Sequence, residues 1–265
     1  MLPILILQTG MIPGRYGITR SFSELFLREG DMDPSRSLIL DATKRALPKD
    51  ISPYGGFIVT GSLAMVTSEH LWSQRLGDFL RRLVLEERPL LAVCYGHQLL
   101  AHALGGRVDY HPLGKEQGTH TITLSDEALE HPYLKGLPQS FPANLSHSQA
   151  VLEPPSGSKV LGSSQHDPFQ IISYGPKALS LQFHPEFNRE TMLAFARPNL
   201  PDPPNLASLK PRSHKKSSKV NLGLPIVETP EARSILQGFV AGLGASPGAS
   251  LGGPEGLFPL SGTGR

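Results

Sequence analysis

Short apolar runs alternate with amphipathic segments along the first 196 residues of the chain. The runs indicate buried strands, because they are continuous, short and bounded by turn-forming residues. The amphipathic segments carry their apolar side chains at helical spacing. The expected strands are residues 4–8, 37–40, 56–60 and 90–93, and the expected helices are residues 21–29, 70–85 and 96–104. This alternation predicts a mostly parallel central sheet with helices on both faces, a three-layer α/β/α fold.

The pattern changes after residue 106. From there to residue 183 we expect short strands without long helices, at residues 119–124, 159–162, 169–173 and 178–183. Such strands are typical of hairpins and sheet edges, so they predict small antiparallel additions to the sheet. A further helix is expected to begin at Arg189.

The chain beyond residue 196 has a different composition. The sequence contains 27 glycines and 25 prolines, and ten of each lie in the last 69 residues. Five Lys and Arg residues fall between Asp202 and Glu228, where no acidic residue occurs. The Thr229-Pro230 pair is typical of a helix start. The expected organisation is an α/β domain at 1–196, a Pro-rich basic linker at 197–228, a helix at 229–243 that packs on the domain, and a disordered Gly/Pro/Ser tail at 244–265.

Composition and charge exclude several classes of protein. The net charge of +2 arises from the basic segment, so we expect no nucleic-acid partner. The single cysteine, Cys94, excludes an intrachain disulfide and a multi-cysteine metal site. The sequence has no apolar run of the roughly 18 residues needed to cross a membrane, and its start lacks the basic region of a signal peptide. We therefore expect a cytoplasmic protein without a membrane partner.

Cys94 lies where an apolar strand runs directly into a helix. Small residues flank it, with Ala92 two positions before and Gly96 two positions after. This pattern is typical of a nucleophile elbow, a tight turn in which neighbouring backbones approach closely. A helix N-terminus stabilises negative charge, and its N–H groups can hold an oxyanion. By itself the segment is equally consistent with an inert buried cysteine.

A second segment places a histidine at the end of a strand and a carboxylate shortly after it. His184 follows the expected strand, and Glu186 comes two residues later across Pro185. A histidine of this kind can act as base to a thiol while the carboxylate fixes its tautomer.

Together the two segments resemble the class I glutamine amidotransferase family, which uses a Cys-His-Glu triad. The family pattern Gly-x-Cys-x-Gly-x-Gln is matched from Ala92 to Gln98 with Ala92 in place of the first glycine, and the His-Pro-Glu strand end is matched in full. The likeness is best to stand-alone, GMP-synthase-like members and covers about residues 1–196. It implies a flavodoxin-like fold. The implied site residues are Cys94 as nucleophile, His184 as general base and then acid, Glu186 as the residue that orients His184, and Gln98 as a substrate-binding residue.

The segment that ends in Gly61 resembles the family's glycine turn. The resemblance implies that the N–H groups of Gly61 and Tyr95 form the oxyanion hole. Many members continue this turn with proline, where the present sequence has Leu63.

Selectivity for glutamine is expected to depend on two loops, residues 114–119 and 146–151. Ser146 and His147 belong to the second loop, and the resemblance implies that they bind substrate. No cofactor and no metal ion are expected, and the sequence has no P-loop for ATP.

Three functions remain open. The first is a glutaminase that passes ammonia to a synthetase partner. The second is a γ-glutamyl peptidase or hydrolase that uses the same triad on another small molecule. The third is a catalytically weak regulatory subunit, suggested by the departures at Ala92 and Leu63.

Overall fold

The computed structural model describes residues 2–197 and 220–243. Within these residues a main sheet has ten strands, and two further strands form a small separate sheet. The strands are β1 (Ile4–Gln8), β2 (Ser37–Asp41), β3 (Gly56–Val59), β4 (Leu90–Val93), β5 (Arg107–Tyr110), β6 (Lys115–Leu124), β7 (Ser140–His147), β8 (Gln149–Glu153), β9 (Lys159–Ser163), β10 (Ile171–Ser173), β11 (Ala178–Leu181) and β12 (Val220–Gly223). The helices are α1 (Phe22–Glu29), α2 (Leu71–Leu85), α3 (Tyr95–Ala103), α4 (Arg189–Ala196) and α5 (Pro230–Gly242), with short 3-10 helices η1 (Gly14–Tyr16), η2 (Pro34–Arg36), η3 (Val66–Ser68) and η4 (Asp126–Glu130).

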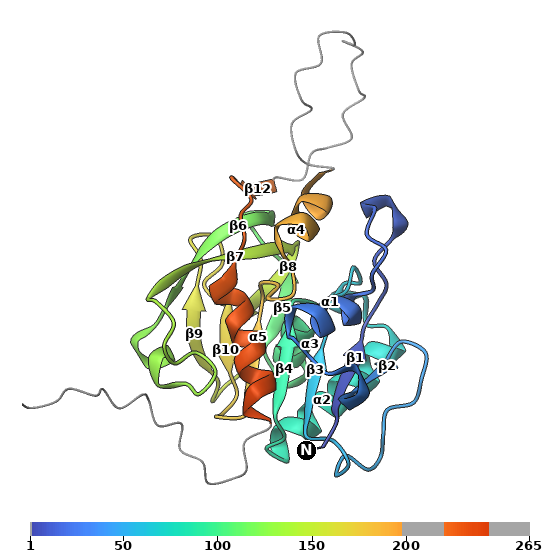
Figure 1. Ribbon diagram of the computed structural model, residues 1–265. Helices are drawn as coiled ribbons and strands as arrows, with labels where there is room; N and C mark the ends of the chain where they lie inside the picture. The colour runs from blue at the N-terminus through green and yellow to red at the C-terminus, as the bar shows by residue number, and fades with distance from the viewer. Residues whose placement is uncertain (1, 198–219, 244–265) are drawn as a thin grey trace, which may run out of the picture.

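The main sheet is parallel over the half that carries the first strands of the chain. Its order is β12-β6-β9-β10-β11-β4-β3-β1-β2, with β7 paired to β6. The neighbours β11, β4, β3, β1 and β2 are all parallel, which confirms the expected mostly parallel sheet (Figure 1). Since the carboxyl ends of parallel strands meet at one edge, the residues that follow β3, β4 and β11 converge there.

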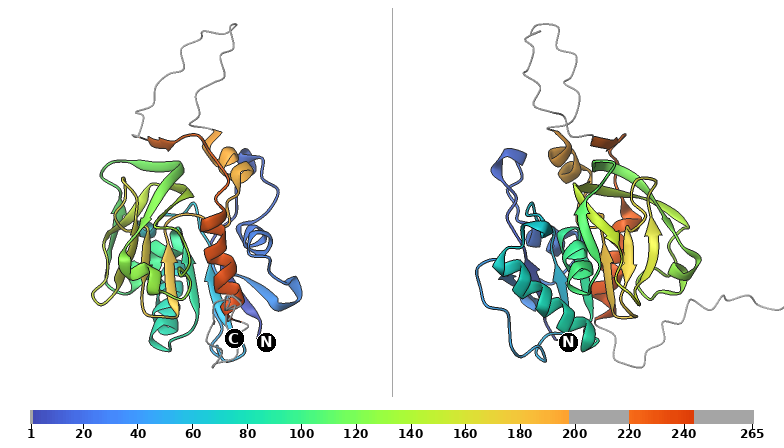
Figure 2. Two further views of the ribbon diagram at one scale, coloured as in Figure 1. Left: turned by 60° about the vertical axis from the view of Figure 1, so that its left-hand side comes forward. Right: turned by 180° about the vertical axis from the view of Figure 1, so that it is seen from behind.

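Helices cover both faces of this parallel half. Leu5 and Leu7 of β1 belong to an apolar cluster with α2 and α3, whereas Ile4 and Ile6 pack with α1 and α5. In Figure 1 helix α5 lies in front of the strands, and α2 faces the viewer in the right-hand view of Figure 2. The predicted three-layer architecture is thereby confirmed, since buried strands with apolar side chains on both faces need cover on both sides.

Antiparallel strands β10, β9, β6 and β7 extend the sheet beyond β11. The prediction that residues 114–119 and 146–151 form loops is wrong. Strand β6 already begins at Lys115, and residues 146–151 form the end of β7 and the start of β8. Strands β5, β7 and β8 were not predicted. In β7 the reason is composition, because Pro142 and Asn144 are residue types that are uncommon in strands.

Strand β12 falls within the segment expected to be a linker. It pairs with β6 in parallel, and the contact is so close that a Cβ atom on Gly118 or Gly223 would collide with the backbone of the other strand. Gly118 also has φ 100°, a conformation that favours glycine. Residues 198–219, with the basic cluster, and the expected tail at 244–265 lie outside the described residues.

Helix α5 begins at Pro230, next to the expected cap residue Thr229. The Thr229 side chain makes no capping hydrogen bond, and its Oγ1 instead accepts one from Asn144 Nδ2 at 3.5 Å. The buried face of α5 packs in the core with α1 and the sheet. None of the helices in the described part of the chain combines the length and apolar character that crossing a membrane requires.

Candidate active site

Cys94 occupies the sharp turn between β4 and α3. Its backbone has φ 51° and ψ −101°, a conformation that is uncommon for a residue with a side chain. The Cys94 N–H donates to the Leu181 carbonyl at 2.7 Å, and the Cys94 carbonyl accepts the Gln98 N–H in the first turn of α3. Backbone strain of this kind concentrates at functional sites, and here it has the form of a nucleophile elbow.

The small residues around Cys94 have separate roles. A Cβ atom on Gly96 would lie 3.0 Å from Val59 Cβ and 3.1 Å from the Val59 carbonyl oxygen, so a glycine lets α3 approach β3. Ala92 is fully buried in the apolar cluster that includes α2 and α3. The methyl group of Ala92 is thus accommodated in the core, and Cys94 still adopts the elbow conformation.

His184 and Glu186 form a buried pair just after β11. His184 Nδ1 lies 2.8 Å from Glu186 Oε1 and donates to it, and the two side chains are 3% and 0% exposed. The His184 ring also stacks on the Phe187 ring, with centroids 3.9 Å apart. These contacts fix the imidazole and leave Nε2 as the ring nitrogen that is available to Cys94.

The surroundings of His184 favour its charged form. Burial alone would lower the pKa of His184, but the Glu186 carboxylate and Cys94 outweigh burial and raise this pKa from 6.5 to about 10. The imidazole is therefore protonated at neutral pH in the resting site and can donate a proton to a leaving group.

Asn144 of β7 holds the turn that carries the pair. Its backbone carbonyl accepts the His184 N–H at 2.8 Å, and its Nδ2 donates to the Phe187 carbonyl at 2.9 Å. Thr119 Oγ1 donates in turn to Asn144 Oδ1 at 2.8 Å. Asn144 and Phe187 were not predicted from the sequence, although Phe187 directly follows Glu186 and its ring stacks on His184.

Gly61 touches both members of the Cys-His pair. A Cβ atom on Gly61 would lie 2.9 Å from His184 Cε1 and 3.5 Å from Cys94 Cβ. Its carbonyl accepts hydrogen bonds from Thr9 Oγ1 at 2.9 Å and Thr60 Oγ1 at 3.1 Å, which orient the turn after β3. The predicted oxyanion-hole glycine therefore lies at the edge of the sheet beside the thiol.

The Tyr95 side chain points away from the site into the core. Its hydroxyl lies 2.6 Å from Ser73 Oγ, and burial raises the pKa of Tyr95 to about 12. The backbone N–H of Tyr95 belongs to the first turn of α3, where N–H groups have no acceptor within the helix. The oxyanion-hole role expected for Tyr95 therefore concerns its backbone N–H and not its side chain.

Gln98 and His147 meet at one carbonyl behind the elbow. Gln98 Nε2 donates to the Gln149 carbonyl at 2.6 Å and to Gln182 Oε1 at 3.0 Å. His147 Nδ1 donates to the same Gln149 carbonyl at 2.9 Å, and its Nε2 lies 3.0 Å from Glu116 Oε2. Both side chains are buried and support the start of β8.

Ser146 lies farther from the elbow, where β7 packs against α4. Its hydroxyl accepts from Gln117 Nε2 at 3.1 Å, and the same Nε2 donates to the Phe195 carbonyl of α4 at 3.0 Å. The structure thus assembles the Cys94, His184, Glu186 and Gly61 positions directly and places Ser146 outside that cluster.

The family model for "Glutamine amidotransferase class-I" matches residues 48–195 of the chain, more than half of its length. The chain belongs to the class-I glutamine amidotransferase family. The match spans the elbow and the His-Pro-Glu turn, so the two segments that carry the resemblance lie in the matched region.

Relatives of this chain carry two kinds of name. The chain is 31% identical over 146 residues to "Gamma-glutamyl peptidase 5" of Arabidopsis thaliana, covering 54% of the chain and 58% of that protein. It is 34% identical over 147 residues to a "GMP synthase [glutamine-hydrolyzing]" of Aeropyrum pernix, covering 56% of the chain and 26% of that protein. The chain thus spans little more than half the length of the peptidase and a quarter of the synthase.

A solved structure of a glutamine amidotransferase from Methylobacillus flagellatus has the same fold. The two structures superpose with a TM-score of 0.64 at 21% sequence identity, covering 91% of the present chain and 95% of the other. This similarity supports the flavodoxin-like class I amidotransferase architecture.

Gly61→Ala is expected to reduce amidotransferase activity without unfolding the protein. The new Cβ would push against His184 Cε1, and a displacement approaching 1 Å at a reacting group can cost ~10²-fold in rate. The measurement is kcat with glutamine and a γ-glutamyl dipeptide, together with a thermal unfolding curve. Gly14→Ala is the matched control, because a Cβ there meets no atom within 4 Å. Equal activity of the two variants would contradict the placement of Gly61 against His184.

Proposed function

We propose that the chain hydrolyses a γ-glutamyl amide through a thioester on Cys94. The observation that carries this proposal is the elbow cysteine beside a buried histidine, whose Nδ1 lies 2.8 Å from Glu186 Oε1. A nucleophile, a base and an orienting carboxylate in this order form the arrangement used in acyl transfer.

The first half of the reaction forms the thioester. The Cys94 thiolate attacks the side-chain carbonyl carbon of glutamine, and the carbon–nitrogen bond breaks as His184 gives its proton to the departing nitrogen. In the second half, water attacks the thioester while His184 accepts a proton, and glutamate leaves with the thiolate restored. Glu186 holds the imidazole tautomer throughout.

The oxyanion that forms on the carbonyl oxygen needs donors. We assign this role to the backbone N–H groups of Gly61 and Tyr95, because Gly61 lies beside Cys94 and Tyr95 begins α3. Gln98 is assigned a role in substrate binding from its place behind the elbow, where its amide donates to the Gln149 carbonyl. Ser146 and His147 are assigned indirect roles in substrate binding. Their hydrogen bonds to Gln117 and to the Gln149 carbonyl hold the neighbouring strands in place.

Glutamine is the proposed substrate, with ammonia released to an acceptor enzyme such as a synthetase. A γ-glutamyl peptide is the second candidate, favoured by the similarity to a protein named γ-glutamyl peptidase. The test compares kcat/KM for glutamine and for γ-glutamyl dipeptides with the same full chain. A preference for glutamine supports the first candidate, and a preference for the dipeptides supports the second. No glutamate from any of them would contradict both and favour a regulatory subunit.

The third candidate, a catalytically weak subunit, rested on Ala92 and Leu63. Burial of the Ala92 methyl group in the core and the elbow conformation at Cys94 speak for a working nucleophile. Leu63 is 40% exposed, so its side chain does not fill the site. A thiol nucleophile is preserved in a reducing compartment, and the cytoplasm is accordingly the proposed location.

Glu186→Gln is expected to shift the alkaline limit of activity to lower pH. Because the pKa of His184 is raised, its proton is present at neutral pH and is lost as the pH rises through about 10. Removing the Glu186 charge removes the largest contact that raises this pKa, so the pKa falls toward 6.5. The measurement is the pH profile of kcat/KM for the wild type and the variant. Glu190→Gln, a change at an exposed carboxylate of α4, should leave the profile unchanged, and an unshifted limit in Glu186→Gln would contradict the assigned pair.

A further inference from the structure

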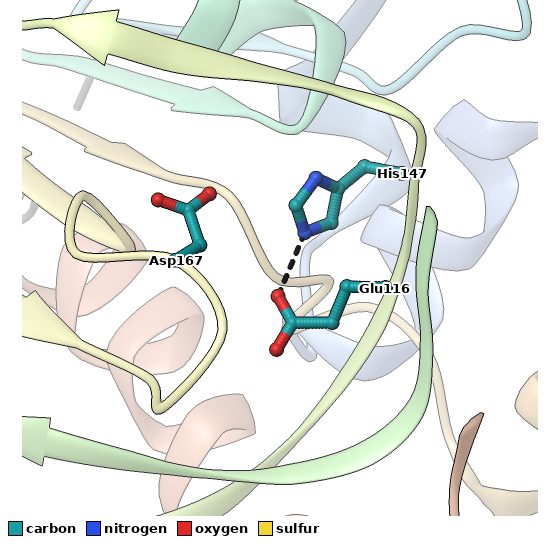
Figure 3. Close-up of side chains that lie close together, drawn as sticks. All are labelled: Glu116, His147 and Asp167. Carbon is teal, nitrogen blue, oxygen red and sulfur yellow. Dashed lines mark hydrogen bonds and ion pairs between the residues drawn. The ribbon is translucent and has the colours of Figure 1, made fainter. Parts of the chain in front are cut away.

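Three side chains with metal-binding atoms lie together outside the Cys-His-Glu triad. Glu116 of β6 and His147 of β7 are cross-strand neighbours, and Asp167 comes from the turn between β9 and β10. One ligand atom from each lies within 4.8 Å of the others, and all three residues are buried (Figure 3).

One atom of each side chain in the cluster is already held by a neighbour. His147 Nδ1 donates to a backbone carbonyl, and one oxygen of each carboxylate accepts a hydrogen bond of 2.8 or 2.9 Å. The partners are the Gln149 carbonyl for His147 Nδ1, Ser164 Oγ for Glu116 Oε1, and the Phe169 N–H for Asp167 Oδ1. Metal sites show this arrangement, in which surrounding groups orient each ligand and fix the histidine tautomer.

The second carboxylate oxygen of Asp167 has a different environment. Asp167 is 0% exposed, and its Oδ2 has no hydrogen-bond partner among the described residues. In Figure 3 the carboxylate lies across from the His147 ring and the Glu116 carboxylate. A buried carboxylate oxygen without a partner is costly, so this atom points to a ligand between the three side chains.

We propose that Glu116, His147 and Asp167 bind one divalent first-row cation through Oε2, Nε2 and Oδ2. One imidazole and two carboxylates suit Zn²⁺ or Mn²⁺, and the two carboxylates balance the charge of the ion. The cation takes the place of the proton between His147 Nε2 and Glu116 Oε2, which lie 3.0 Å apart. Gln170 Nε2 also donates to Glu116 Oε2 at 2.9 Å, and the second lone pair of that oxygen allows both contacts.

The geometry requires a small movement of Asp167. With cation-ligand distances of about 2.0–2.2 Å, neighbouring ligand atoms lie roughly 3–3.5 Å apart. Asp167 therefore has to move toward the other two ligands, and it lies in the segment between β9 and β10 and not in a paired strand. Since His147 Nδ1 and Gln98 Nε2 share the Gln149 carbonyl, the cation also secures the support of Gln98.

The test uses the full chain carrying Cys94→Ala, because a thiolate beside His184 is itself a zinc ligand. The metal-depleted protein is titrated with Zn²⁺, and bound metal and Tm are measured. The expected result is one Zn²⁺ per chain and a Tm that rises with Zn²⁺. Adding Asp167→Asn should weaken Zn²⁺ binding by ~10-fold or more and abolish the rise in Tm. Asp126→Asn, the same change at an exposed residue of η4, should preserve both.

Two outcomes would overturn the proposal. One is the absence of Zn²⁺ uptake by the Cys94→Ala chain, and the other is equal Zn²⁺ binding by the Asp167→Asn and Asp126→Asn chains. If Asp167→Asn does not fold, imidazole ¹⁵N NMR of the Cys94→Ala chain decides. Zn²⁺ must then change the ¹⁵N chemical shift of Nε2 in one histidine. A change at several histidines, or at none, would contradict the site.

Discussion

Replacing Cys94 by alanine should reduce release of glutamate from glutamine or a γ-glutamyl dipeptide by ~10⁴-fold or more, as loss of a nucleophile does in comparable hydrolases. The physical reason is that the thioester can no longer form, while the remaining groups still bind substrate. The measurement is glutamate release under saturating substrate, with a thermal unfolding curve to show that the elbow still folds.

A second substitution separates chemistry from packing. Cys94→Ser keeps the size and position of the side chain but supplies a far weaker nucleophile, so it should be as inactive as Cys94→Ala. Glutamate release by either variant at more than a small fraction of the wild-type rate would mean that Cys94 is not the nucleophile.

His184→Ala should cost ~10³–10⁴-fold in kcat, the second largest effect that we expect. The variant lacks both the proton donor for the leaving nitrogen and the base for the attacking water. Because Cys94 and His184 act as one unit, the double variant should be about as inactive as Cys94→Ala alone. The measurement is a double-substitution cycle on kcat.

The cycle also has a result that would count against the pair. If the two losses multiply, then Cys94 and His184 contribute independently, and their pairing has no catalytic role. Asn188→Ala provides a control for the turn, since Asn188 caps α4 through the Thr191 N–H and should affect stability more than kcat.

The parts of the fold and site that could be predicted from sequence are those determined by local patterns. The strands β1, β3 and β4 are continuous apolar runs because they are buried on both faces, and their ends were placed within a residue. Cys94 and His184 were found because each follows such a strand in a short recognisable segment. Their convergence follows from the parallel order of β4 and β11.

The parts that could not be predicted depend on pairing between distant segments. Glu116 faces His147 only through the register of β6 and β7, and a shift of one residue would separate them. The residues around His147 form a strand and not the expected loop. The His147 side chain therefore donates to the Gln149 carbonyl. Asn144 was not predicted for the same reason, because its side chain donates to Phe187, 43 residues away along the chain.

The most direct test of the central claim is the intact mass of the protein quenched with acid during turnover. In wild type exposed to excess glutamine, or to a γ-glutamyl dipeptide, a fraction of the chain should carry one added γ-glutamyl group, which peptide mapping should locate on Cys94. The adduct should be absent from Cys94→Ala. A γ-glutamyl group on another residue, or turnover without any adduct in wild type and with full activity in Cys94→Ala, would contradict catalysis through a thioester on Cys94.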